Sequence, residues 1–160
     1  MNFRNFFNNL KEPIYKDDLK RVLLNGILYA VLFGVLAGAL QFFSEVYIGL
    51  TMGVFVFAIG YMIAKKINES FFTFHVWYPI ISVLLFLLAF VIYNFTKLFF
   101  LLRNLHLAIQ IFFSLSGLNY MFGFLNIFNY QNVDILYNII DLIIFISSVG
   151  CAWQMVYRRR

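Results

Sequence analysis

The chain has 160 residues, of which 63% are hydrophobic and 12% are charged, and its formal net charge is +5. A mean hydropathy of +0.85 leaves too little polar surface to cover a water-soluble globule of this length, so composition excludes a soluble protein. The basic residues are dispersed at the ends of apolar runs, which argues against nucleic-acid binding. We therefore expect an all-α integral membrane protein with a single domain, residues 1–160.

Residues 1–12 have the periodicity of an amphipathic helix. Four apolar side chains recur at i, i+3, i+4 and i+7, while asparagines and basic residues cover the other face. This pattern is typical of a helix that lies at the membrane surface with its phenylalanines in the acyl boundary. A docking helix for a soluble partner is the alternative. The residues expected to contact the membrane surface are Phe3, Phe6, Phe7 and Leu10.

The next two apolar runs, at about 22–43 and 46–64, are each long enough to cross a bilayer. Only a few residues around Ser44 and Glu45 separate them, so we expect an antiparallel hairpin. Small residues recur on both runs, and in lipid such stripes let two backbones approach closely, within the hairpin or between two copies of the chain. These packing residues are Gly26, Ala30, Gly34 and Gly38 on the first run, and Gly49, Gly53, Gly60 and Ala64 on the second.

Two further spans are expected at about 74–95 and 135–157. Trp77 and Tyr78 provide interfacial aromatic residues at the start of the third span. The last span ends in three consecutive arginines at the end of the sequence. Four spans are therefore predicted, provided that the long segment between the last two does not cross the membrane as well.

That intervening segment, residues 98–131, is long enough to contain a fifth span. With four spans, however, ten lysines and arginines lie on one side and two on the other, whereas five spans give seven and five. The excess of positive charge on the cytoplasmic side favours four spans with both termini cytoplasmic. Because residues 98–131 are too hydrophobic for a solvated loop, we expect an outer-face segment that lies on the membrane or re-enters the bundle.

The last span carries a charged residue, Asp141, on the same helical face as Asn138. A carboxylate within the membrane is costly unless it is protonated, paired or hydrated, so it indicates a functional site. One hypothesis is a polar or ion site for a proton or cation, with Arg103 and His106 near the same outer mouth. The alternative is a structural role, in which Asp141 makes an interhelical hydrogen bond or ion pair with Arg103, Lys97 or Gln41.

No motif for catalysis, metal binding or cofactor binding is present. The only cysteine is Cys151, and the two histidines do not have the spacing of a metal site. No nucleophile elbow or phosphate-binding glycine loop occurs in a suitable context. We expect no cofactor, no metal and no enzymatic activity.

A glycine-rich hairpin ends at residues 60–66, GYMIAKK, and the last span opens at residues 132–137, NVDILY. With the third span and apolar linker between them, these features resemble small four-span bacterial integral membrane proteins of unassigned function. The resemblance implies four spans and supplies no catalytic residues.

Three functions remain open. The first is a non-enzymatic scaffold or sensor subunit in the cell membrane, a multi-pass homo-oligomer that contacts lipid and engages a cytoplasmic protein. The second is a small oligomeric channel or transporter with Asp141 as an intramembrane proton or cation site. The third is an intramembrane enzyme. We favour the first because small four-span proteins without soluble domains commonly work within assemblies, and the small-residue stripes could pack copies of the chain together.

Overall fold

The computed structural model describes residues 13–49, 53–125 and 135–158. Within these ranges the chain is helical and contains no strand, which confirms the all-α prediction. The amphipathic helix expected at residues 1–12 lies outside the described residues. The elements are α2 (Lys16–Ile48), α3 (Val54–Ser70), α4 (Trp77–Leu102), α5 (Leu105–Phe112), α6 (Leu115–Met121), the 3-10 helix η1 (Gly123–Leu125) and α7 (Ile135–Tyr157).

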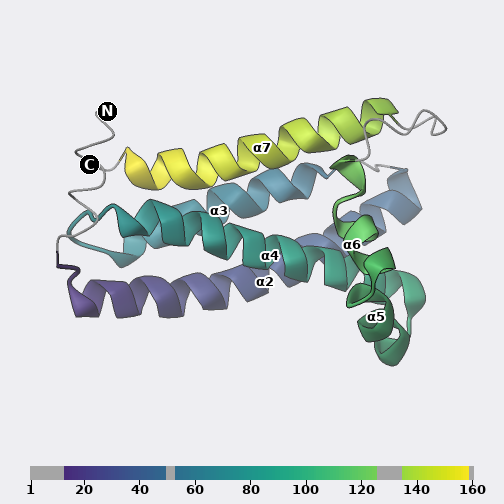
Figure 1. The fold of residues 1–160 in the computed structure, drawn as a ribbon, viewed down its shortest axis with the longest axis horizontal. Coiled ribbons are helices and arrows are strands. Elements are labelled where there is room, and N and C mark those ends of the chain that lie inside the picture. The colour runs from purple at the N-terminus through teal and green to yellow at the C-terminus, as the bar shows by residue number, and fades with distance from the viewer. Residues whose placement is uncertain (1–12, 50–52, 126–134, 159–160) are drawn as a thin grey trace.

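The four long helices lie side by side, and α5 and α6 gather at one end of them (Figure 1). Helices α2 and α4 run in the same direction, whereas α3 and α7 run in the opposite direction. Helices α3 and α4 each pack against both α2 and α7. The described chain therefore begins and ends at the same end of the bundle, opposite α5 and α6.

Three helices are long and apolar enough to cross a membrane, namely α2, α4 and α7. This finding supports membrane association, with three such helices in the described residues where four were expected. The helix that does not qualify is α3, which has 17 residues and includes the polar sequence from Lys65 to Ser70. The second predicted span, 46–64, is thus displaced and shortened in the structure.

The displacement arises because α2 does not end near Ser44. It continues through Glu45 to Ile48 and stops at Gly49, whose φ of 72° is the left-handed conformation that favours glycine at a helix C-terminus. Glu45 is accommodated in the last turns because Gln41, one turn earlier, donates a hydrogen bond to it. The turn between the first two helices therefore lies several residues later than the sequence predicts.

Helix α4 extends seven residues beyond the predicted third span and ends at Leu102. Residues 98–102, expected to begin the outer-face segment, therefore belong to this long helix. The remaining part of the segment begins with two short helices, each capped at its N-terminus by a side chain. Asn104 accepts a hydrogen bond from Leu107 N, and Ser114 accepts one from Gly117 N. Residues 126–131 lie outside the described residues.

The core lies among the four long helices and is mainly apolar. Its most completely buried large side chains include Ile59 and Ile63 of α3 and Phe86 of α4. The opposite face of α2 exposes leucine, isoleucine and valine along much of its length, including Leu24 and Leu28. A helix with a small-residue inner face and a broad apolar outer face is suited to a bundle that is surrounded by lipid.

Candidate functional site

A polar cavity of about 210 Å³ lies at the end of the bundle that carries α5 and α6. Pockets for drug-sized ligands are typically about 300–1,000 Å³, so this space suits an ion with a few waters or another small solute. Its walls come from the start of α3, from α4, α6 and η1, and from the first half of α7. The polar residues that line it are Tyr93, Asn94, Lys97, Tyr120, Asn138 and Asp141.

The carboxylate of Asp141 connects α7 with the start of α3. Its Oδ1 accepts a hydrogen bond of 2.9 Å from the backbone N–H of Gly53, the residue that precedes α3. The N-terminus of a helix carries partial positive charge, so this position favours a negative group. The hydrogen-bond partner of Asp141 is therefore a backbone group, and not one of the side chains considered from the sequence.

A second charged group of the site joins α2 with α4. Lys97 Nζ lies 2.6 Å from Glu45 Oε1, and Gln41 Nε2 donates a hydrogen bond of 3.0 Å to the same oxygen. The side chains of Lys97 and Glu45 are only 23% and 21% exposed, so water screens this ion pair less than it screens a surface pair. The two charges compensate each other at the margin of the cavity.

Tyr120 of α6 covers this ion pair. The Lys97 ammonium lies 5.8 Å from the centroid of the Tyr120 ring, within the range of a cation–π contact. The Tyr120 hydroxyl is buried and has no hydrogen-bond partner within the described part of the chain. Burial, together with the Glu45 carboxylate, raises the pKa of Tyr120 above its usual value, so the phenol remains protonated and able to donate or accept a hydrogen bond.

The four residues expected to form a polar or ion site lie in two different parts of the structure. Asn138 and Asp141 line the cavity, whereas Arg103 and His106 do not. Arg103 is exposed where α4 gives way to α5, and His106 Nε2 lies 3.0 Å from Gln110 Nε2 on the exposed face of α5. The structure therefore brings together only the two residues that already share the last span.

Sequence reasoning missed the contribution of α4 and α6 to this site. Tyr93 and Lys97 are four residues apart, a spacing that places two side chains on one helical face, and Gln41 and Glu45 have the same spacing on α2. These local signals were available. Nothing in the sequence shows that the two pairs meet, or that Tyr120 covers them.

The glycines of α2 pack on α4. A Cβ added at Gly34 would lie 2.8 Å from the carbonyl oxygen of Ala89, and one at Gly38 would lie 2.5 Å from that of Tyr93. Gly26 is closed in by the side chain of Leu85. Ala30, on the same stripe, is completely buried. The first small-residue stripe thus meets α4, the helix that runs parallel to α2.

The small residues of the second run have separate roles. A Cβ at Gly60 would lie 2.8 Å from the carbonyl oxygen of Ser148, so this glycine lets α3 approach α7 closely, and Ala64 is completely buried one turn further along. Gly49 caps α2 and has open space around it. The backbone N–H of Gly53 donates a hydrogen bond to Asp141 Oδ1.

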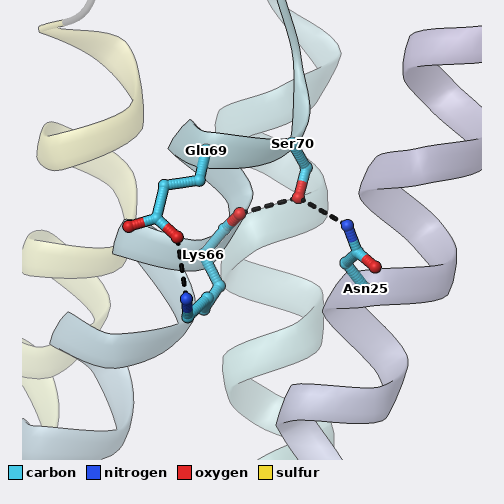
Figure 2. A network of polar contacts seen from close by, with 4 residues as sticks. All are labelled: Asn25, Lys66, Glu69 and Ser70. Carbon is cyan, nitrogen blue, oxygen red and sulfur yellow. Dashed lines mark hydrogen bonds and ion pairs between the residues drawn. The ribbon is translucent and has the colours of Figure 1, made fainter.

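The opposite end of the bundle contains polar contacts that hold helices together. Asn25 Nδ2 donates to Ser70 Oγ at 3.1 Å, and Ser70 Oγ donates to the carbonyl oxygen of Lys66 at 2.7 Å. Figure 2 shows these contacts beside the ion pair of Lys66 with Glu69. They join α2 to the end of α3, and we regard them as structural.

A buried carboxylate, Asp18, holds the connection between α3 and α4 at that same end. Its Oδ2 accepts hydrogen bonds from the backbone N–H groups of Phe72 and Thr73, each at 3.2 Å, and from Thr73 Oγ1 at 3.1 Å. Such a set of donors compensates for the burial of a negative charge. Asp18 therefore acts as a structural clamp.

Within the described residues, no three His, Cys, Asp or Glu side chains lie close enough together to hold a metal ion. Comparison with protein-family models, curated proteins and solved structures gives no match.

Proposed function

We propose that the chain is a non-enzymatic multi-pass membrane protein, a scaffold or sensor subunit that self-associates and engages a cytoplasmic partner. The observation that carries the proposal is the outer face of α7. This helix is apolar enough to span a membrane, yet its buried residues are only Ser148, Ala152 and Val156. The other residues of this helix are half-buried or exposed.

The outer face of α7 is unusual for a surface in contact with lipid because it carries small and polar residues. Its groove includes Ser147, Gly150, Cys151, Gln154 and Arg158, which recur at the spacing of a single helical face. Lipid tails cannot hydrogen-bond the Ser147 hydroxyl or the Gln154 amide, whereas a second copy of the chain can. We call these five residues the α7 stripe and propose that it is the self-association surface.

We further propose that α3 is a fourth crossing. Since α2 and α4 run in the same direction, α3 has to return the chain across the membrane if both of them span it. At about 1.5 Å per residue its 17 residues extend roughly 26 Å, of which the apolar part from Val54 to Ala64 spans about 17 Å, so the polar end from Lys65 to Ser70 would lie at the membrane interface. Packing against α2, α4 and α7 would shield this less apolar helix from lipid.

The distribution of basic residues supports an orientation. Within the described ranges, the end of the bundle where the chain begins and finishes carries six of them, and the end with the cavity carries Lys97 and Arg103. By the positive-inside rule the first end is cytoplasmic. The N-terminal residues and the basic tail would then be available to a cytoplasmic partner. The six residues are Lys16, Lys20, Arg21, Lys65, Lys66 and Arg158.

A sensor is favoured over a channel because Phe90 and Phe145, one turn further into the bundle than Asn94 and Asp141, also line the cavity. The centroids of these two rings are 5.0 Å apart, and Phe86 packs 5.8 Å from Phe145. An aromatic cluster at this position disfavours a polar path through the bundle. An enzyme is disfavoured because His106, the best candidate base, does not line the cavity with Asp141.

Crosslinking through the native cysteine tests self-association. The chain has one cysteine, and it lies in the α7 stripe, so a short bifunctional maleimide applied to membranes should join two copies through Cys151. The matched control is Cys151→Ser with Leu28→Cys, which moves the thiol to an exposed position on α2. We expect dimers with the first protein and not with the control.

A substitution within the stripe makes this test more specific. Gly150→Leu should reduce the crosslinked fraction several-fold with little effect on folding, because nothing lies within 4 Å of a Cβ at this position. An intact Cys151 that yields no dimer, in a protein that native mass spectrometry finds to be strictly monomeric in lipid nanodiscs, would refute the proposal.

A further inference from the structure

The cavity contains one negative charge that the described protein does not neutralise. Among the described residues, Lys97 and Asp141 line the cavity, and Glu45 lies beside it as the partner of Lys97. Glu45 and Lys97 neutralise each other in their ion pair. Asp141 has a single hydrogen bond within the described residues, the one from Gly53 N–H to Oδ1, and its second oxygen receives none. A partly buried carboxylate in this state requires a counter-ion, a proton or ordered water.

Neutral oxygen atoms surround the carboxylate. Asn94 uses its amide nitrogen to donate to Phe90 O at 2.9 Å, and its amide oxygen accepts no hydrogen bond from the described residues. The Asn138 side chain also lines the cavity without such a bond. Both asparagines thus offer amide oxygens at the wall of the cavity. One carboxylate with amide oxygens and water is the type of ligand set that hard cations prefer.

The charge balance selects a monovalent ion. A divalent ion would leave an excess positive charge close to Lys97, because among the described residues Asp141 is the one carboxylate that lines the cavity. The volume of about 210 Å³ leaves room for the waters that would complete the coordination of a small ion.

We infer that this cavity binds a small monovalent metal cation, with Asp141 as its anionic ligand and Asn94 and Asn138 as neutral oxygen ligands. Since these ligands come from α4 and α7, occupancy would hold these two helices together. The role of the cation as the signal of a sensor rests on the proposed function, whereas its binding does not.

The test uses the full chain in detergent or nanodiscs, titrated with sodium or potassium chloride against N-methylglucamine chloride at equal ionic strength. We expect a saturable rise in melting temperature with one of the metal cations only, since a ligand that binds the native state stabilises it. Asp141→Asn should raise the half-saturating concentration by at least about tenfold. The control is Glu69→Gln, a carboxylate that is 50% exposed at the opposite end, which should leave the response unchanged.

A second variant keeps the test decisive if Asp141→Asn does not fold. Asn138→Ala removes one neutral oxygen and no charge, and it should weaken the response several-fold. An equal response to N-methylglucamine, stability that depends on pH but not on the metal cations, or an unchanged half-saturating concentration in the folded variants would overturn the inference. If the protein shows no cation response but crosslinks through Cys151, the cation site is refuted and self-association is not. If it shows the cation response but does not crosslink, self-association is refuted and the cation site is not.

Discussion

At the scale of single residues, the main finding is the ion pair between Lys97 and Glu45. It joins α2 to α4 with both side chains mostly shielded from water, and Gln41 supports the carboxylate from the same helix. The sequence predicted that Glu45 lies in the turn between the first two spans and that Lys97 lies beyond the end of the third, on the outer side. Both residues are instead helical, because each provides the charge that the other needs when it is partly buried.

Removing both partners should therefore cost less than the sum of the costs of removing each one alone. Lys97→Met leaves the Glu45 carboxylate with only the Gln41 hydrogen bond, and we expect a loss of about 1–3 kcal/mol in the free energy of unfolding. The double variant with Glu45→Gln should lose less than the sum of the two single variants, by about 1 kcal/mol. Unfolding in mixed micelles measures all three. Additive losses would show that the pair contributes no coupling.

At the scale of elements, small residues decide which helices can touch. Gly34 and Gly38 bring the backbone of α2 against carbonyl groups of α4, and Gly60 brings α3 against α7. The periodicity of these glycines was visible in the sequence and predicted close packing. The helices on which these glycines pack could not be predicted, because a small-residue stripe has no side chain that could specify its neighbour.

An added methyl group tests this packing directly. Gly38→Ala places a Cβ 2.5 Å from Tyr93 O and 2.8 Å from Thr96 Cβ, so we expect a loss of about 1–3 kcal/mol from overpacking despite the better helix propensity of alanine. Gly150→Ala is the matched control, since open space surrounds that position. It should leave stability unchanged or slightly raised. Equal stability of the two variants in mixed-micelle unfolding would contradict this packing.

At the scale of the whole molecule, the bundle separates two chemically different ends. One carries Asp18 and most of the described basic residues, and the other carries the polar cavity beneath α5 and α6. Three helices meet the length and hydropathy of a span, and the proposed orientation depends on whether α3 also crosses.

Cysteine labelling in intact cells can determine this orientation. In a Cys151→Ser background, we expect a membrane-impermeant maleimide to label Tyr47→Cys and His106→Cys from outside. Tyr15→Cys and Lys65→Cys should react only after permeabilisation. All four positions are exposed, so differences in labelling report on the side of the membrane. External labelling of Lys65→Cys together with Tyr47→Cys would show that α3 does not cross.

The sequence by itself determined the helical membrane class and the approximate positions of the first, third and last long helices. An apolar helix satisfies its own backbone hydrogen bonds, so this information is local. The tertiary structure decided where α2 ends, that α2 packs on α4, and that Asn138 and Asp141 share a cavity with Tyr93, Lys97 and Tyr120. These outcomes depend on contacts between residues far apart in the chain. In lipid, where apolar burial hardly distinguishes one neighbour from another, close packing and polar pairing choose the partners.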